Sequence, residues 1–327
     1  MRRRDVVAGA PALALSALLP KAARAQDKYP GRTVRLIVPT PAGGVYDLVG
    51  RLFMDRIGPS LGTSIVENRA GGNATVGVIA ASQAAPDGYT LLLGSNSTHV
   101  FQPAMMRTPP YDPVKQFIPI TAVTASWASI VVSPKLGVKT LPELVDYAKK
   151  NPGKLSLGMR GIGDSSHMTA ELLKSLTGIS LQYIPYSAMA QAVRDLMTGD
   201  LMMTVPLLTR NLVELHEAGK INLLAVTSPK RLAIAPNTPT AVEAGVPNMI
   251  AAEYFYVFAP AGTPLPIVQK LNDIAREALT DDAFRHKLLD AGFDPLFAGG
   301  LDETRALFES ERARWLPIAK AAGVQIN

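Results

Sequence analysis

The chain has 327 residues, with 33 Lys or Arg against 27 Asp or Glu, so its formal net charge is +6. It contains no cysteine, which excludes disulfide bonds, thiolate metal sites and a cysteine nucleophile. A chain of this length can bury a core without disulfides, in one large domain or two medium ones.

The first 25 residues have the features of an export signal. Three arginines at positions 2–4 precede an apolar stretch over residues 6–19, and an Ala-x-Ala site ends at Ala25. This pattern predicts a signal peptide at residues 1–25 and hence a periplasmic protein. Residues 3–7 (RRDVV) resemble a twin-arginine signal, and a Sec signal fits the same basic start, so the export route stays open.

The signal segment also accounts for most of the positive charge. It holds five basic residues and one acidic residue, so the predicted mature chain keeps 28 basic and 26 acidic residues. The mature chain shows no basic run with interleaved aromatic residues. We therefore expect no nucleic-acid partner.

After the signal segment, strand-like and helix-like segments alternate along the chain. This alternation predicts an α/β fold with mainly parallel sheets covered by helices. The predicted strands cover residues 34–38, 64–67, 89–93, 130–133, 155–158, 181–185, 201–205, 223–227 and 255–259.

Several helices are marked by apolar spacing or by capping residues. Apolar residues from Leu48 to Leu61 recur as on one face of a helix. Thr140, with Pro142 and Glu143 after it, has the pattern of an N-cap with a capping box. The last seventy residues show no strand pattern and fit three helices, at residues 266–279, 282–291 and 301–322.

Two segments have the character of connections between domains. Residues 126–133 and 253–260 are hydrophobic and extended in character; Pro134 follows the first segment and Pro260 ends the second. We expect them to act as paired hinges. Because ligands of open α/β domains bind beyond the carboxyl ends of strands, two facing domains would enclose a cleft.

The run VPTPAGG at residues 38–44 lies between a predicted strand and a predicted helix. Two adjacent glycines let the backbone approach a ligand closely. The free amides that open the following helix, with the positive end of its dipole, favour a small anion. The alternative is an ordinary strand-to-helix turn.

The familiar catalytic motifs are absent from the sequence. The four histidines are dispersed, without a His-Glu-x-x-His arrangement, so no metal site is expected. The sequence also lacks a Gly-x-Ser-x-Gly elbow, a Ser-x-x-Lys pair, a P-loop and a Gly-x-Gly-x-x-Gly fingerprint.

Residues 161–167 (GIGDSSH) admit two interpretations. Gly-Asp-Ser resembles the nucleophile block of one esterase family, but Asp282 and His286 are one residue too far apart for the Asp-x-x-His pair of that family. The second interpretation is a glycine-rich turn between a strand and a helix, which meets a ligand from the side opposite residues 38–44. His167 is expected to cap or pack at the helix start rather than to bind ligand.

Blocks of residues spread over nearly all of the mature chain resemble the substrate-binding receptors of tripartite tricarboxylate transporters, the Bug-type periplasmic proteins. These blocks, in order, are VPTPAGG with Asp47, VENRAGG at residues 66–72, PDGYTLL at 86–92, Thr98-His99, PYDP at 110–113, GIG with His167, IPY at 184–186, LAVTS at 224–228 and APAGTP at 259–264.

The resemblance implies a type II periplasmic-binding-protein fold with two lobes and a cleft between them. It implies a first lobe of residues 26–127 and 256–327 and a second lobe of residues 128–255. It also implies a monomer without cofactor or metal, which takes a small organic carboxylate to membrane permease subunits. Carried over, the ligand contacts are Ala42, Gly43, Gly44, Asp47, Ser97 and Thr98 from the first lobe, with Gly163, Asp164, Ser165 and Ser187 from the second.

The chain departs from the family pattern at several of these positions. Asp164 stands where Ser or Thr is usual, Ser187 and Ala188 replace a common Lys-Gly, and residues 202–207 lack a common acid. Thr40 stands where an aromatic residue is usual. An ionised Asp164 would repel a ligand carboxylate, so we predict a ligand with a carboxylate at the first lobe and an ammonium or neutral hydroxyl group near Asp164. The alternative is that Asp164 caps the helix starting near Ser166.

The resemblance favours transport without catalysis as the function. A receptor that presents its ligand to a signalling kinase is the alternative within the same fold. An exported hydrolase is the third and least favoured hypothesis.

Overall fold

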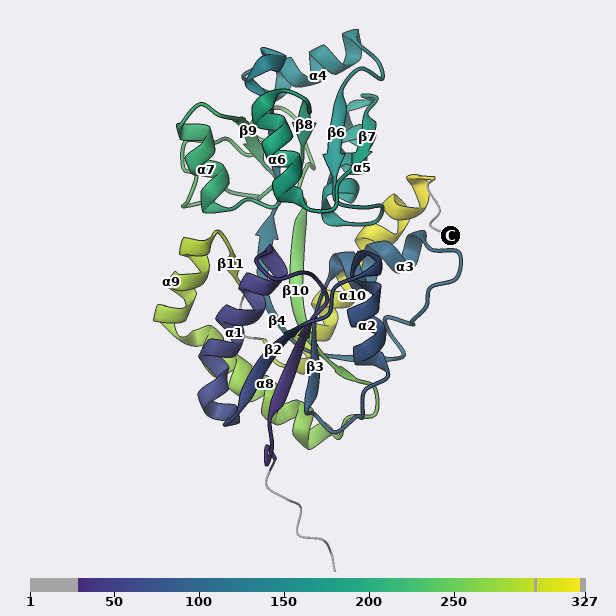
Figure 1. The fold of residues 1–327 in the computed structure, drawn as a ribbon, viewed down its shortest axis with the longest axis vertical. Coiled ribbons are helices and arrows are strands. Elements are labelled where there is room, and N and C mark those ends of the chain that lie inside the picture. The colour runs from purple at the N-terminus through teal and green to yellow at the C-terminus, as the bar shows by residue number, and fades with distance from the viewer. Residues whose placement is uncertain (1–28, 297–298, 324–327) are drawn as a thin grey trace, which may run out of the picture.

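The computed structural model describes residues 29–296 and 299–323, which form two lobes, each built on its own β-sheet (Figure 1). This confirms the predicted two-lobed α/β fold. The first lobe contains a six-stranded sheet in the order β11-β4-β10-β3-β1-β2, and the second contains a five-stranded sheet in the order β7-β6-β8-β5-β9.

The first-lobe sheet has parallel strands β1, β2 and β3, with β10 antiparallel to both β3 and β4, and β11 antiparallel to β4. Its strands are β1 (Val34–Val38), β2 (Ser64–Asn68), β3 (Thr90–Ser95), β4 (Phe117–Trp127), β10 (Ala252–Pro260) and β11 (Asp294–Pro295). Its helices are α1 (Val45–Leu61), α2 (Thr75–Ser82), α3 (Gln102–Met105), α8 (Leu265–Thr280), α9 (Asp282–Ala291) and α10 (Leu301–Ala321), with the short turns η1 (Gly72–Ala74) and η2 (Ser97–Phe101).

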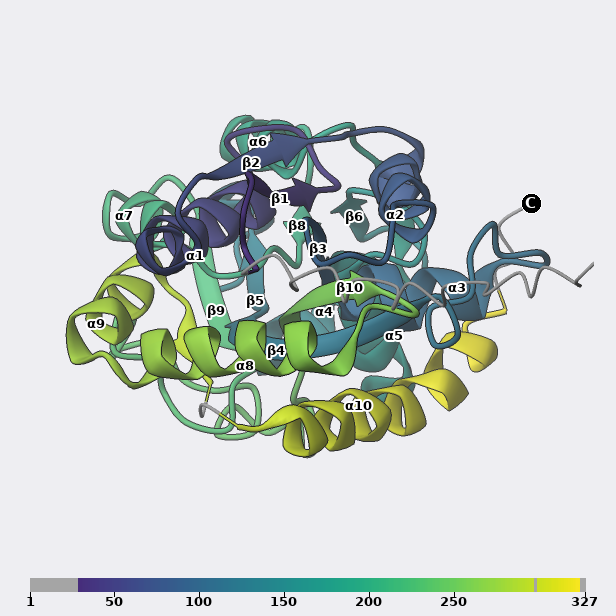
Figure 2. The same ribbon diagram turned by 90° about the horizontal axis from the view of Figure 1, so that it is seen from below.

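Both faces of this sheet are covered, because successive residues of a strand point to opposite faces. Leu36 and Val38 of β1 pack with α1, α8 and α9, whereas Ile37 faces the side of α2, α3 and α10. Seen from below, α1 and α9 gather on the left and α2 and α3 on the right (Figure 2).

The second-lobe sheet has parallel strands β6, β7 and β8, with β5 antiparallel to β8 and β9. Its strands are β5 (Ser129–Val132), β6 (Ser156–Met159), β7 (Gln182–Pro185), β8 (Met203–Thr204) and β9 (Asn222–Val226), and its helical segments are η3 (Pro134–Leu136), α4 (Leu141–Lys150), α5 (Ser165–Thr177), α6 (Met189–Thr198) and α7 (Arg210–Glu217). The predicted N-cap is confirmed, since Thr140 Oγ1 accepts a hydrogen bond from the Glu143 amide at 3.3 Å.

All nine predicted strands are present within a few residues, but two others were not predicted. The expectation of no strand in the last seventy residues was wrong, because Asp294 and Pro295 pair with β4. The 11-residue β4 was also missed. Its small residues and Pro119 have a weak preference for strands, so the local sequence does not predict one. The hydrogen bonds to β10 stabilise the strand instead.

The two lobes are joined where strands cross between them. The chain passes from β4 through Ala128 into β5, and it returns through Ala251 into β10. The Thr227 amide donates to Ala128 O and the Ala251 amide donates to Thr227 O, which ties the crossings together. Residues 253–260 were expected to form one of the two hinges. They are extended but lie within β10, which is paired with β3 and β4, so the crossing comes before them, at Ala251.

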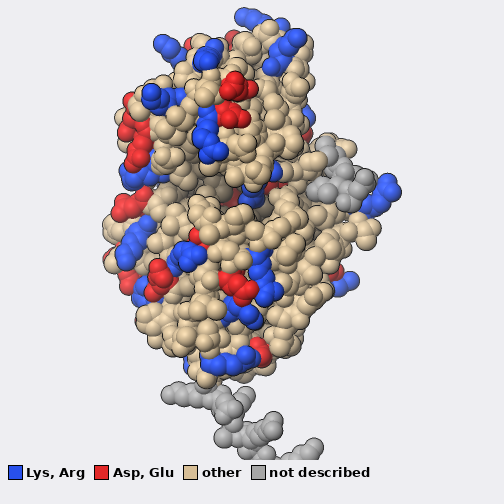
Figure 3. All heavy atoms as spheres, in the orientation of Figure 1, with Lys and Arg blue, Asp and Glu red and all other residues tan. Residues whose placement is uncertain are grey.

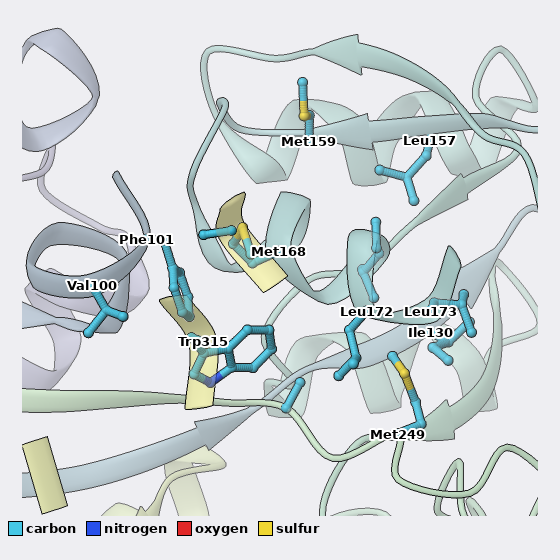
Figure 4. Close-up of a cluster of buried hydrophobic side chains, with 14 of the residues drawn as sticks. Val100, Phe101, Ile130, Leu157, Met159, Met168, Leu172, Leu173, Met249 and Trp315 are labelled. Carbon is cyan, nitrogen blue, oxygen red and sulfur yellow. The ribbon is translucent and has the colours of Figure 1, made fainter. Parts of the chain in front are cut away.

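A buried apolar cluster also bridges the lobes and extends to the crossings, since it includes Ile130 and Ala251 (Figure 4). Trp315 of α10 lies with its ring centroid 5.0 Å from that of Phe101 in η2. Met168 and Leu172 of α5 belong to the same cluster. The first and second lobes therefore share part of one hydrophobic core.

No helix within residues 29–296 and 299–323 is both long enough and apolar enough to cross a membrane.

The bridging cluster predicts a large loss of stability on truncation of its largest member. Because Trp315 is 1% exposed, Trp315→Ala should lower the free energy of unfolding by ~3–5 kcal/mol. Urea denaturation followed by circular dichroism measures this change. Leu265→Ala, at an apolar side chain 68% exposed, is the control and should change it by less than about 0.5 kcal/mol.

Candidate functional site

The first-lobe loop at residues 41–44 is exposed and ends at the start of α1. Gly43 has a φ of +82°, a left-handed conformation that glycine adopts without strain. Gly44 is the N-cap of α1, and no described side chain caps this helix end. The opening amides of α1 and the positive end of its dipole are therefore left for solvent or an anion.

Asp47 holds this loop in place from the first turn of α1. Its carboxylate accepts hydrogen bonds from the Gly43 amide at 2.9 Å, from Arg51 Nε at 3.0 Å and from Asn68 Nδ2 at 2.9 Å. Burial alone would raise the pKa of Asp47, but these hydrogen bonds outweigh it and lower the pKa. The carboxylate and the Gly43 amide thus have partners within the protein.

The second-lobe turn at residues 161–165 precedes α5, and Asp164 caps that helix. Asp164 Oδ1 accepts hydrogen bonds from the His167 amide at 2.9 Å and from Ser166 Oγ at 2.6 Å. Its other oxygen accepts from Arg160 Nε at 3.3 Å. The capping alternative is therefore observed, with α5 beginning at Ser165, and the Asp164 charge is paired with a cation.

His167 stabilises the same turn from within α5. Its Nδ1 accepts a hydrogen bond from the Gly163 amide at 3.2 Å, and its ring packs edge-on against Tyr183. Burial, the largest influence, lowers the pKa of His167, which favours the neutral imidazole that accepts this bond. The expected capping or packing role is observed, and the Gly163 amide is occupied by it.

The second-lobe turn closely approaches the first lobe, at η1 and at the start of α3. Asn73 Nδ2 of η1 donates to Ile162 O at 3.2 Å. A Cβ placed on Gly163 would lie 3.1 Å from Gln102 Cα, and one on Gly161 would lie 2.9 Å from Asn73 Nδ2. Glycine at these positions therefore permits the contact between lobes. The face shown in Figure 3 is hollowed between the two lobes.

Arg160 is a residue of the site that sequence reasoning missed. It directly follows β6, is partly exposed, and places its guanidinium carbon 5.7 Å from the ring centroid of Tyr46 in α1. It thus links a second-lobe cation to a first-lobe aromatic ring. Its position at the carboxyl end of a strand was the signal that could have identified it.

Tyr46 also belongs to a buried polar network centred on Glu253. Glu253 Oε1 accepts hydrogen bonds from Tyr46 Oη and the Ser97 amide, each at 3.1 Å, and from Ser95 Oγ. Burial, the largest influence, raises the pKa of Glu253, although the hydrogen bonds and Arg160 act to lower it. Sequence reasoning assigned Glu253 only to a connecting strand.

The other residues predicted to contact the ligand lie in different environments, some buried and some exposed. Ser97 is buried beside Glu253, and Thr98 Oγ1 accepts from the Ser95 amide at 2.9 Å. Ala42 is exposed in the first-lobe loop, and Ser165 opens α5. Ser187 is exposed and donates to Gln191 Oε1 at 3.2 Å, so its hydroxyl is engaged at the start of α6.

The residues considered for a hydrolase or a metal site do not come together in the described part of the chain. The late Asp282 and His286 lie on α9, on the side of the molecule opposite α5 in Figures 1 and 2. Among the residues that the structure describes, no group of three or more His, Cys, Asp or Glu side chains is placed to hold a metal ion.

The Asp47 network predicts a pH-dependent contribution to stability. Asp47→Asn should lower the free energy of unfolding at pH 7 by ~1–3 kcal/mol, because the three donors around Asp47 lose their charged acceptor. The pKa of Asp47 is lower in the folded state than in the unfolded chain, where it is about 4. The ionised carboxylate therefore stabilises the fold fully above about pH 4, and this stabilisation is lost as the pH falls through the pKa of the folded state. The difference between wild type and variant should therefore shrink below about pH 4 in urea titrations. A constant difference would contradict the role of the ionised carboxylate.

The Gly163 contact predicts a variant that strains the contact between the lobes. Gly163→Ala adds a Cβ 3.1 Å from Gln102 Cα, so Gln102 must shift by a few tenths of an ångström. Gly178→Ala is the matched control, since Gly178 has a similar φ of +71° with open space around its Cβ position. Both variants should lose ~1–2 kcal/mol of unfolding free energy from backbone strain, and Gly163→Ala should lose more than Gly178→Ala in urea denaturation. Equal losses would contradict a close contact at Gly163.

Three comparisons relate this architecture to known proteins. The model of the tripartite tricarboxylate transporter family receptor matches residues 49–324. Protein BugT of Bordetella pertussis is 32% identical over 303 residues, which cover 92% of each chain. The structure of R. palustris Rpa4515 with adipate has a TM-score of 0.84 and 33% identity, covering 91% of this chain and 99% of that one. The periplasmic binding protein BugD has a TM-score of 0.81 and 33% identity, with the same coverage.

These matches extend over both lobes and agree with the motifs in the sequence. They confirm the resemblance and the two-lobed binding-protein fold. The chain belongs to the family of tripartite tricarboxylate transporter receptors.

Proposed function

We propose that the protein is a periplasmic receptor that captures a small organic carboxylate between its lobes and delivers it to the permease subunits of a tripartite tricarboxylate transporter. It acts as a monomer, without catalysis, cofactor or metal. The ligand contacts come from the ten residues predicted from the sequence, namely Ala42, Gly43, Gly44, Asp47, Ser97, Thr98, Gly163, Asp164, Ser165 and Ser187. Asp47 and Asp164 act mainly by holding the two turns, and Thr98 by holding the junction of β3 and η2.

The observation that carries this proposal is the uncapped start of α1 behind the exposed first-lobe loop. Unsatisfied amides and the positive end of a helix dipole favour a carboxylate. Thr40 Oγ1, in the same loop, is buried and has no hydrogen-bond partner among the described residues. It supplies a further donor for the same anion. Adipate, bound by the relative Rpa4515, is a dicarboxylate and supports this ligand class.

The charge of Asp164 does not oppose such a ligand. Its carboxylate is paired with Arg160 and with the first amides of α5, so the expected like-charge repulsion is offset within the second lobe. A guanidinium has five N–H donors, more than its bond to Asp164 uses, so Arg160 adds positive potential beside Tyr46. An ammonium on the ligand is then not required near Asp164.

The proposed capture depends on closure of the lobes. The second lobe runs from residue 128 to residue 251, because β10 belongs to the first-lobe sheet from Ala252 on, four residues before the predicted boundary at residue 256. Closure bends the crossings near Ala128 and Ala251. The closed form gains contacts from both turns, so ligand binding shifts the population toward it. Residues 1–25, outside the described part of the chain, direct export by the Sec or twin-arginine route.

The experiment is isothermal titration calorimetry with small carboxylates and with their matched amides. We expect the acids to bind and the amides to bind on the order of ten-fold more weakly or worse, because a neutral amide loses the charge interaction with α1. Equal binding of an acid and its amide would contradict an anion site.

Thr40→Val tests whether the Thr40 hydroxyl binds the ligand, because its expected effects on affinity and on stability differ. Valine removes the hydroxyl but keeps the branched shape, so acid affinity should fall several-fold, by ~0.5–1.5 kcal/mol for one hydrogen bond. Stability in urea should stay equal or rise, because a buried hydroxyl without a partner is removed. Unchanged acid affinity would exclude Thr40 as a donor to the ligand.

A further inference from the structure

Asn73, in the short turn η1 of the first lobe, reaches across to the second lobe. Its Nδ2 donates a hydrogen bond to Ile162 O at 3.2 Å, and Ile162 lies in the turn that precedes α5. A Cβ placed on Gly161 of that turn would lie 2.9 Å from Asn73 Nδ2 and 3.1 Å from its Cγ and Oδ1. The Asn73 side chain is therefore packed against the second lobe as well as bonded to it.

The backbone of η1 adopts a conformation that most residues avoid. Asn73 has a φ of +51° and Ala74 a φ of +78°, so both lie in the left-handed region. Asparagine tolerates this region, whereas alanine is strained there. Gly71 and Gly72, which precede them, also have positive φ. Because strained backbone persists only where its surroundings enforce it, the contacts that hold η1 are essential to its shape.

One of these contacts ties η1 to the first-lobe loop, and another ties it to the second lobe. Helix α2 follows η1 directly, and a Cβ on Gly77 of α2 would lie 2.7 Å from Pro39 Cα, just before the first-lobe loop. The other contact is the hydrogen bond from Asn73 to Ile162 O. The short segment from η1 to Gly77 therefore connects the second-lobe turn to the chain that leads into α1.

We propose that Asn73 is a positioning residue, a latch whose hydrogen bond to Ile162 O holds the second-lobe turn against the first lobe and so tightens ligand binding. The bond exists only while the lobes touch, so it stabilises the closed form relative to the open one. The donor bonds a carbonyl of the protein itself, so its effect should be the same for different ligands. The effect on the ligand rests on the proposed function, whereas the effect on the contact between the lobes does not.

Hydrogen–deuterium exchange of the purified protein, without added ligand, tests the latch. Asn73→Gly removes the donor but keeps the backbone conformation, since glycine adopts positive φ without strain. Amide exchange in residues 160–166, in the opposite lobe, should become roughly two- to ten-fold faster, as expected for the loss of one hydrogen bond. Asn248→Gly is the matched control and should leave this exchange unchanged. Asn248 is exposed, has a φ of +64°, and its side chain makes no hydrogen bond with the other described residues.

Asn73→Asp is the second variant, since it keeps the size of the side chain but replaces the donor with a carboxylate that only accepts. It should speed exchange in residues 160–166 at least as much as Asn73→Gly does. Faster exchange only around residue 73 would indicate a local role in η1 and would overturn the latch. Exchange in residues 160–166 at the wild-type rate in both variants would overturn it as well.

Calorimetry with adipate, malate, succinate and citrate then tests the effect on binding. For each acid that binds, Asn73→Gly should weaken the affinity by the same factor, roughly two- to ten-fold, and Asn248→Gly should not change it. A loss confined to one acid would indicate a direct ligand contact and overturn the latch as the cause. Binding of none of the acids would contradict the proposed function, whereas the exchange measurement would still support or overturn the latch.

Discussion

The approach of the second-lobe turn to the first lobe is the contact on which the candidate site depends. Gly161 and Gly163 have no side chains, so the turn comes within van der Waals distance of Asn73 and Gln102. A single methyl group at Gly163 would press on the backbone of Gln102 as well as on its side chain. Only with this approach do the N-termini of α1 and α5 and the side chain of Arg160 border the same space.

The polar groups around this contact have separate tasks. Asp47 and Asp164 are buried acids whose oxygens are satisfied by neighbouring amides and by arginines, so they hold the turns in shape. Thr40, Ser97, Gln102 and Glu253 instead retain unsatisfied atoms. The first kind of group is structural, whereas the second kind can take an ordered water or a ligand group as its partner. The buried apolar cluster around Trp315 supports both, because it contains residues of both lobes.

Most of the fold could be predicted from the sequence because its signals are local. Strands such as β1 and capping residues such as Thr140 depend on neighbours within a few positions, and the structure confirms both. β4 could not be found in this way, because its order comes from pairing with β10 more than a hundred residues away.

The candidate site was predicted only in part, because some of its residues are far apart in the sequence. The two glycine-rich turns and the capping role of Asp164 follow from short motifs. The neighbours Arg160, Gln102 and Glu253 come from β6, η2 and β10, and only the folded chain brings them together. Asp164 illustrates the limit: its charge was visible in the sequence, but the cation that pairs with it was not recognised as a partner.

The central claim is that a ligand carboxylate binds at the start of α1, between the two turns. A crystal structure with a bound carboxylate tests it most directly. The account predicts carboxylate oxygens about 2.7–3.2 Å from the amide nitrogens of Gly44, Val45 or Tyr46, with the second-lobe turn closed over the ligand. A carboxylate bound elsewhere, such as in the 250 Å³ hollow lined by Trp127 and Arg231, would contradict it.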